Sequence, residues 1–244
     1  MGGAAPRRRV REACWRVKAT FHGHACFVLE RNGKRVIIDP FLTGNPAAVI
    51  GPDQLPHLDA ILLSHGHGDH LGDAVALSKQ HKATIVATYE LAQFCADQGG
   101  TSHAMHIGGA HEFPFGIVKL VPAFHGGRVE GDTTGRYTTN PAGVVVTIGG
   151  KTVYHTGDTG LTLEMQLLAG PPRIDLMLVP IGDNYTMGVA DAARAVEFVK
   201  PKSVIPMHYN TWDVIKADPA EFRRLVGNTS AVTILKPGES YTLP

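Results

Sequence analysis

The 244-residue chain predicts an α/β protein in which two mixed sheets pack face to face with helices outside. Strand-type segments joined by tight turns come first, and strand-type and helix-type segments then alternate to the C-terminus. A chain of this length with 43% hydrophobic residues can bury a sizeable core. Because no linker or change in composition divides it, we expect one domain over residues 15–244, preceded by a disordered tail over residues 1–14.

The first third of the chain favours strands. Residues 15–21, 25–30 and 35–38 are rich in apolar and β-branched side chains, and Asn32-Gly33 is typical of a hairpin turn between the second and third of these segments. Residues 39–56 are rich in Gly, Asn and Pro and predict a loop. The apolar residues 59–63 predict a buried strand.

Alternation of strands and helices follows. A short strand at residues 83–87 is expected between helices at 71–81 and 89–97, whereas the Gly- and His-rich residues 99–115 favour no regular element. The remaining strands are expected at 116–122, 142–148, 152–155, 174–180, 203–206 and 231–235, and the remaining helices at 162–169, 189–199 and 219–226.

Composition narrows the function. A net charge of +1 gives no global field that attracts nucleic acid or anionic lipid, and we read Arg7-Arg8-Arg9 as part of a solvated tail rather than as a nucleic-acid site. The three cysteines show no C-x-x-C spacing, which favours a reduced chain. No apolar run reaches transmembrane length, and the start lacks a signal peptide's apolar segment. We therefore expect a cytoplasmic protein without nucleic-acid or membrane partners.

One short stretch, Ser64-His65-Gly66-His67-Gly68-Asp69-His70, carries most of the chemistry. It follows the strand expected at 59–63, and its glycines let the backbone bend around a common point. Imidazoles with one carboxylate suit zinc, and also manganese or iron. The alternative is a solvated polar turn, but a chance loop rarely collects four ligand-type side chains in the spacing H-x-H-x-D-H.

Four further ligand-type residues each follow a predicted strand: His24, His125, Asp158 and His208. Taken singly, each is more typical of a hydrogen-bonded surface residue. Loops at one rim of a sheet are, however, where rigid scaffolds assemble metal sites from distant parts of the chain. We therefore expect these residues to converge on the histidine cluster.

In order and spacing, these motifs are similar to those of the metallo-β-lactamase superfamily, and more closely to its uncharacterised small metal-dependent hydrolases related to the ascorbate-6-phosphate lactonases. The resemblance runs from Phe21 to the C-terminus. The segments that carry it are 23–25, 38–46, 65–70, His125, 156–159, 180–184 and 205–211.

The resemblance implies a four-layer αββα sandwich with two divalent metal ions at the rim between the sheets, zinc being expected first and manganese or iron also being suitable. One ion would take His65, His67 and His125; the other would take Asp69, His70 and His208. Asp158 would bridge the two ions together with a hydroxide. Two such ions about 3.5–4 Å apart activate a water and hold both reacting oxygens.

The expected catalytic residues are Asp69 and His24. His24 would donate a proton to the leaving group, with a structural hydrogen bond as the alternative. Asp39, at a strand end, would accept the free N–H of a ligand histidine, or would merely cap its loop. His155 is expected to point into the core or toward the layer of Asp39, and it is not counted as a ligand.

The resemblance alone suggests that Asp183, Asn184 and Asn210 line the substrate pocket. Residues 126–128 depart from the serine-rich stretch of near relatives, so the substrate wall is expected to differ. Residues 127–140, with Arg128, Arg136 and Tyr137, would form either a mobile lid with an anion-binding arginine or a solvated loop. The remaining histidines that we assign to the surface are His57, His81, His103, His106 and His111.

The function expected is binuclear hydrolysis of a carboxylic ester or lactone in a small-molecule substrate. The alternative within the same chemistry is a phosphodiesterase acting on a nucleotide or lipid, although a nucleic-acid substrate would require a basic face that is absent. A di-iron redox protein and a non-catalytic metal-binding protein are weaker alternatives. A homo-oligomer is compatible with the sequence.

Overall fold

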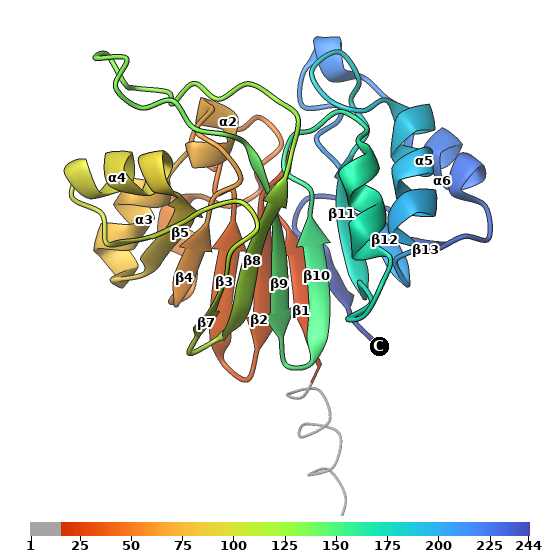
Figure 1. Cartoon of the computed structure of the whole chain (residues 1–244), viewed down its shortest axis with the longest axis horizontal. Helices are drawn as coiled ribbons and strands as arrows, with labels where there is room; N and C mark the ends of the chain where they lie inside the picture. Colours follow the sequence, from red (N-terminus) through yellow and green to blue (C-terminus); the bar gives the residue numbers. More distant parts are fainter. Residues whose placement is uncertain (1–15) are drawn as a thin grey trace, which may run out of the picture.

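Residues 16–244 are described by the computed structural model, and within them two seven-stranded sheets face each other with helices on both outer faces (Figure 1). This arrangement confirms the predicted αββα layers. The predicted tail, residues 1–14, lies outside the described residues.

The first sheet is antiparallel at one end and parallel at the other. The strand order is β14 (Ser240–Thr242), β1 (Lys18–Phe21), β2 (Phe27–Arg31), β3 (Lys34–Ile38), β4 (Ala60–Leu62), β5 (Thr84–Thr88) and β6 (Ser102–Met105). In this sheet β1, β2 and β3 form an antiparallel meander, β14 pairs with β1, and β4, β5 and β6 extend the sheet in parallel.

The second sheet follows the same plan. The strand order is β13 (Ala231–Val232), β12 (Ser203–Met207), β11 (Leu176–Pro180), β10 (Lys151–His155), β9 (Ala142–Ile148), β8 (Gly116–Pro122) and β7 (Ala110–Phe113). In this sheet β7 to β10 are antiparallel, and β11, β12 and β13 add to β10 in parallel.

Three apolar clusters separate the layers. The central cluster joins the two sheets through residues such as Leu62 and Val144. A second cluster packs the first sheet against α3 (Ala74–His81) and α4 (Tyr89–Asp97), and a third packs the second sheet against α5 (Val189–Val199) and α6 (Pro219–Val226). The start of α6 is encoded locally, because Asp218 accepts a hydrogen bond from the Ala220 amide and Pro219 occupies the first turn.

Three sequence expectations need correction. The helix expected at 71–81 is split into α2 (Gly68–Leu71) and α3, since Gly72 takes a positive φ where the chain passes the Pro40 carbonyl. Residues 162–169 form a 3₁₀ helix, η2 (Leu163–Leu168), and the strand expected at 231–235 shortens to two residues in β13.

Some elements have no counterpart among the predicted ones. Residues 99–115, for which the sequence favours no regular element, form the edge strands β6 and β7, and β14 corresponds to no predicted strand. Two further 3₁₀ turns are η1 (Pro52–Gln54) and η3 (Asp213–Ile215).

Residues 127–140 form an anchored arm that extends at the upper left of Figure 1. Val129 is fully buried in the cluster beneath α4, and the Glu130 amide donates to the Gly66 carbonyl at 2.7 Å. The Tyr137 hydroxyl donates to Asp97, and its ring packs on Phe94. These contacts attach the arm to α4 and to the loop that carries His65 and His67.

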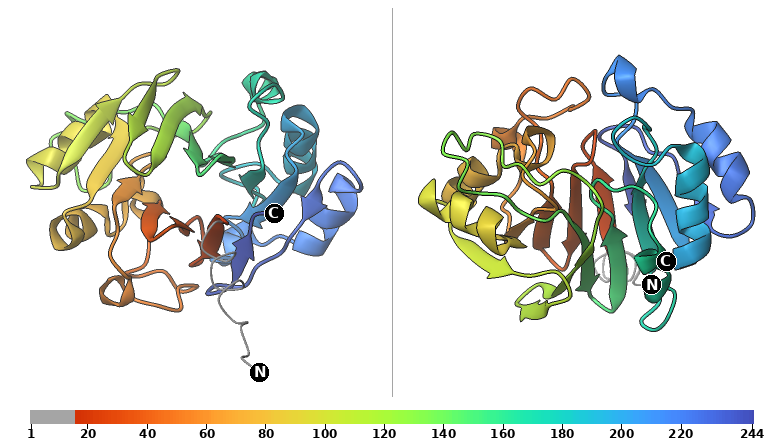
Figure 2. Two further views of the ribbon diagram at one scale, coloured as in Figure 1. Left: turned by 90° about the horizontal axis from the view of Figure 1, so that it is seen from below. Right: turned by 45° about the horizontal axis from the view of Figure 1, so that its top comes forward.

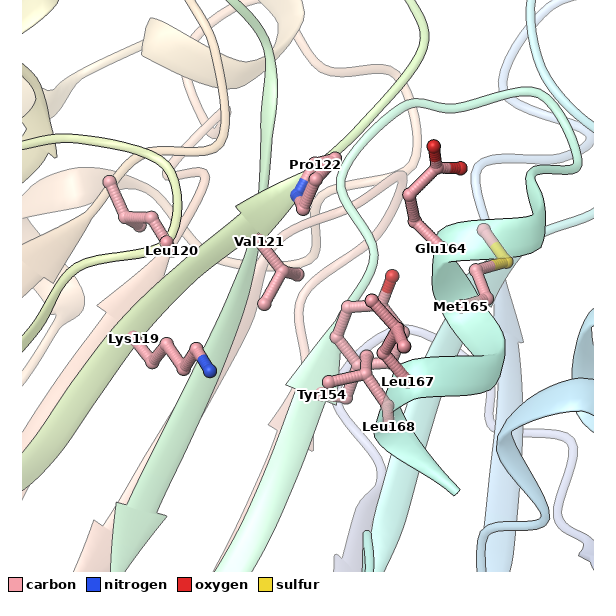
Figure 3. Close-up of a pocket in the computed structure, with 10 residues that line it drawn as sticks. Lys119, Leu120, Val121, Pro122, Tyr154, Glu164, Met165, Leu167 and Leu168 are labelled. Carbon is pink, nitrogen blue, oxygen red and sulfur yellow. The ribbon is translucent and has the colours of Figure 1, made fainter. Parts of the chain in front are cut away.

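A cavity of about 180 Å³ lies between the outer face of the second sheet and η2, where Val121, Tyr154 and Met165 line it (Figure 3). Its lining is mostly apolar and shares no residue with the histidine cluster. No helix within residues 16–244 is both long enough and apolar enough to cross a membrane.

Gly72 provides a test of this packing. A Cβ at this position would lie 2.4 Å from the Pro40 carbonyl oxygen and 2.7 Å from the Phe41 Cα, and its φ of +41° is unfavourable for other residues. We expect Gly72→Ala to lower the free energy of unfolding by about 2–4 kcal/mol in urea titrations followed by circular dichroism. Gly170→Ala, where a Cβ meets nothing within 4 Å, is the matched control, and equal stability of the two variants would contradict this packing.

Candidate metal centre

The ligand-type residues meet at one rim of the sandwich, where loops leave the carboxyl ends of the strands (top of Figure 1, brought forward in Figure 2, right). His65 and His67 follow β4, His70 lies in α2, and His125, Asp158 and His208 follow β8, β10 and β12. Strands of both sheets therefore supply the site, as the strand-end positions predicted. The side chains form three overlapping groups that could each hold a cation.

The first group consists of His65, His67 and His125. His65 Nε2 lies 3.0 Å from His67 Nδ1, which lies 3.2 Å from His125 Nε2. Nitrogens bound to one tetrahedral zinc at about 2.0–2.1 Å lie about 3.3 Å apart, so this spacing suits a shared cation. Burial lowers the pKa of His65 and of His125, which favours the neutral imidazole that a metal requires.

The second group gathers Asp69, His70 and His208 with His24. Asp158 lies between the two groups. Its Oδ1 is 3.2 Å from His70 Nε2, and its Oδ2 is 3.0 Å from His208 Nε2 and 3.5 Å from His125 Nε2. One carboxylate therefore contacts histidines of both groups at once.

Several buried polar atoms in the centre have no hydrogen-bond partner within residues 16–244: His70 Nε2, Asp158 Oδ1, and both ring nitrogens of His208. Buried polar atoms are normally paired, because leaving them unpaired costs the full desolvation penalty. Two of these atoms, His70 Nε2 and Asp158 Oδ1, face each other across the proposed ligand set. A bound cation would satisfy them, so the residues present fit a divalent metal.

The charges of the centre agree with this fit. Although burial lowers the pKa of His208, the charge of Asp158 raises it to about 9, and Asp158 raises the pKa of His70 in the same way. Burial opposes ionisation of Asp69 and Asp158, yet the neighbouring histidines hold the pKa of both carboxyls below the usual range. The centre therefore attracts positive charge, which a metal ion would provide in exchange for protons.

Asp39 orients two of the histidines. Its Oδ2 accepts a hydrogen bond from His70 Nδ1 at 2.7 Å and another from the Ser64 hydroxyl at 2.6 Å, and its Oδ1 accepts from the Ser64 amide. Since the Ser64 hydroxyl donates to Asp39, it can accept from His65 Nδ1 at 2.9 Å. Both histidines thus turn Nε2 toward the centre.

His24 and His155 have different surroundings. The His24 side chain is fully buried, and burial lowers its pKa to about 4, which favours the neutral imidazole. A neutral ring has one donating and one accepting nitrogen. Its Nε2 donates to Asp69 at 3.0 Å, and its Nδ1 accepts from the Thr211 hydroxyl at 2.8 Å. His155 is also buried, and its Nε2 donates to the Ala25 carbonyl at 2.8 Å. The structure therefore places His155 in the core.

A cavity of about 230 Å³ opens above the centre. The three residues expected from the resemblance, Asp183, Asn184 and Asn210, do not line it, and neither do His24, Arg128 and Arg136. Its lining residues are His67, Asp69, His125, Asp158, Tyr185, His208 and Trp212.

Unusual backbone conformations concentrate at this rim. Of the nine non-glycine residues with positive φ among those described, six are expected site residues: His24, Asp39, Asp183, Asn184, His208 and Asn210. Such conformations cost free energy and persist where the surrounding structure imposes them, typically at functional sites. The residues outside the cavity lining therefore shape the loops that carry the lining residues.

Sequence reasoning missed Ser64, Thr211, Tyr185 and Trp212. Ser64 and Thr211 adjoin expected site residues, but a hydroxyl beside a ligand has many surface roles. Tyr185 and Trp212 directly follow segments that we had recognised, and only their exposure in the fold separates them from core aromatics.

Comparison with known proteins agrees with this geometry. The profile of the Beta-lactamase superfamily domain matches residues 34–209. A "UPF0173 metal-dependent hydrolase" of Pelotomaculum thermopropionicum is 52% identical over 230 residues, covering 93% of this chain and all of that protein. A protein of the same name from Bacillus cereus strain B4264 is 49% identical over 229 residues, with the same coverage of both chains.

Among solved structures, Igni18, described as a novel metallo hydrolase from the hyperthermophilic archaeon Ignicoccus hospitalis, has 32% identity and a TM-score of 0.86. The match covers 94% of this chain and 99% of that one. The protein is therefore a metal-dependent hydrolase of the metallo-β-lactamase superfamily and belongs to its UPF0173 family.

Proposed function

We propose that the chain is a binuclear metal-dependent hydrolase that cleaves a carboxylic ester or lactone in a small molecule. The observation that carries this proposal is the position of Asp158, which contacts histidines of two ligand groups at one rim. A site with one metal would not require a buried carboxylate between two such groups.

In this proposal His65, His67 and His125 hold one ion, Asp69, His70 and His208 hold the other, and Asp158 touches both. Zinc suits this imidazole-rich donor set best, and manganese or iron is also compatible with it. When bound, two divalent ions would lower the pKa of a water and polarise the ester carbonyl.

The chain's own residues would complete the reaction. Asp69 lines the cavity and is 26% exposed, while its Oδ2 is held by His24 at 3.0 Å. Its Oδ1 would accept the proton of the attacking water and deliver it to the leaving oxygen when the acyl C–O bond breaks. His24 is buried and absent from the cavity lining, so we propose that it positions Asp69 rather than contacting the substrate.

A phosphodiester is the second candidate, because a pair of metal ions can also stabilise an in-line displacement at phosphorus. Among residues 16–244, no Lys or Arg lines the cavity to hold the anionic phosphate. This lining favours the ester or lactone.

The proposal predicts that enzyme loaded with zinc or manganese hydrolyses δ-valerolactone or phenyl acetate faster than bis-p-nitrophenyl phosphate, when kcat/KM is measured for each. Asp158→Ala should lose most of this turnover, because it removes the carboxylate shared by the two groups. Faster cleavage of the phosphodiester, again lost in Asp158→Ala, would instead assign the chain to the second candidate. Turnover of the ester that persists in Asp158→Ala would refute the proposed site.

His24→Ala is expected to lower kcat about 10–100-fold while the metal content stays unchanged, because an orienting hydrogen bond to Asp69 is lost. His81→Ala, which alters a histidine outside the centre, serves as the control. Kinetics and elemental analysis of the same samples give both readouts. A loss of bound metal in His24→Ala would contradict this expectation and show that His24 is a ligand or supports one.

A further inference from the structure

Two aromatic side chains stand at the mouth of the metal-centre cavity. Tyr185 is 58% exposed and Trp212 is 40% exposed, and both line the cavity. Phe124, directly before His125, is 62% exposed, and Val214 in η3 is 51% exposed. Large apolar side chains that are exposed together around a functional centre indicate a surface that is covered when a ligand binds.

The Trp212 ring packs against two other aromatic rings, those of His24 and Phe41. Its ring centroid lies 5.0 Å from that of His24 and 6.1 Å from that of Phe41. The loop that carries it is closed by a hydrogen bond from the Asn210 amide to the Ile215 carbonyl and by another from the Ala217 amide to Asn210 Oδ1. These contacts fix the position of the indole before a ligand binds, so little side-chain entropy is lost on binding.

Tyr185 belongs to a tight turn on a neighbouring loop, between β11 and α5. Within this turn the Asp183 carboxylate accepts from the Asn184 amide at 2.9 Å, and the Asp183 carbonyl accepts from the Thr186 amide at 3.1 Å. An isolated bridge between Gly182 and Gly188 closes the turn. The loops from β11 and β12 thus each present one aromatic ring to the same cavity.

The residues that line the cavity do not favour an anionic substrate. In the described part of the chain no Lys or Arg lines the cavity, and Lys216, the cation close to Trp212 in sequence, is paired with Asp213 at 2.9 Å. Apart from the metal ions, a carboxylate or phosphate on the substrate would find no positive partner there, whereas an uncharged ring would find two aromatic faces.

The size of the cavity limits the substrate further. Its volume of about 230 Å³ lies below the range of roughly 300–1,000 Å³ that is typical of pockets for drug-sized ligands. A cavity of about 150 Å³ can hold benzene. The space therefore suits a single ring together with the ester group at the metal centre.

We propose that Trp212 and Tyr185 form a subsite for one uncharged apolar or aromatic ring beside the scissile ester, and thereby select small neutral esters over anionic ones. This inference rests on the proposed ester hydrolysis. It assigns to the two aromatic residues the discrimination between substrates, and to the histidine and aspartate cluster the cleavage.

The kinetic test compares phenyl acetate with 4-acetoxybenzoate, which differ only in a ring carboxylate. The metal-loaded wild type should have a kcat/KM at least tenfold higher for phenyl acetate. Trp212→Ala and Tyr185→Ala should raise KM for phenyl acetate more than they lower kcat, and Trp212→Phe should restore most of the affinity. Tyr89→Ala removes an aromatic side chain that is 52% exposed on α4 and should change neither parameter.

A binding test separates this inference from the proposed function. Acetophenone and 4-acetylbenzoate carry the same rings without a scissile ester, so calorimetry with the metal-loaded protein does not depend on turnover. We expect acetophenone to bind at least tenfold more tightly, and this preference to disappear in Trp212→Ala.

Each result has a distinct meaning. If the ketones bind as expected while no ester is hydrolysed, the proposed function fails and the ring subsite stands. If 4-acetylbenzoate binds equally or more tightly, or if neither aromatic variant alters acetophenone binding, the ring subsite is refuted even when esters are hydrolysed.

Discussion

The rim of this sandwich depends on one electrostatic constraint: two carboxylates, one of them buried, and five imidazoles of the candidate ligand set meet with too few hydrogen-bond partners among themselves. Asp158 is almost completely buried, and His70 and His208 have ring nitrogens without partners. Without positive charge at this point the arrangement would be costly. Protons on His70 and His208, or a divalent cation in their place, relieve that cost.

The rest of the structure holds these groups in place. Asp39 fixes His70 directly and His65 through Ser64, and His24 fixes Asp69. The positive φ angles of Asp39 and His208 turn the chain sharply at the strand ends. Both sheets pack on one apolar interior, which brings loops from the two halves of the chain to the same rim.

Much of this was predictable, for identifiable reasons. The spacing H-x-H-x-D-H and the strand-end positions of His125, Asp158 and His208 identify a cluster, because strands of known direction bring their ends together. The helices predicted at 89–97, 189–199 and 219–226 have the observed bounds, because the alternation of strand-type and helix-type segments marks them. Edge strands β6, β7 and β14 escaped because they are short and partly exposed, so neither alternation nor apolar runs mark them. The roles of Tyr185 and Trp212 were not predicted, because the exposure of a side chain depends on tertiary structure. In the sequence alone these two residues look like core aromatics.

The most direct test of the account is the number of metal ions per chain, measured by elemental analysis of the wild type and of Asp158→Ala after equilibration with zinc. The account predicts two ions per chain in the wild type and at most one in the variant, with unchanged circular dichroism. One ion in the wild type, or two in the variant, would contradict the bridging role of Asp158 and with it the binuclear centre.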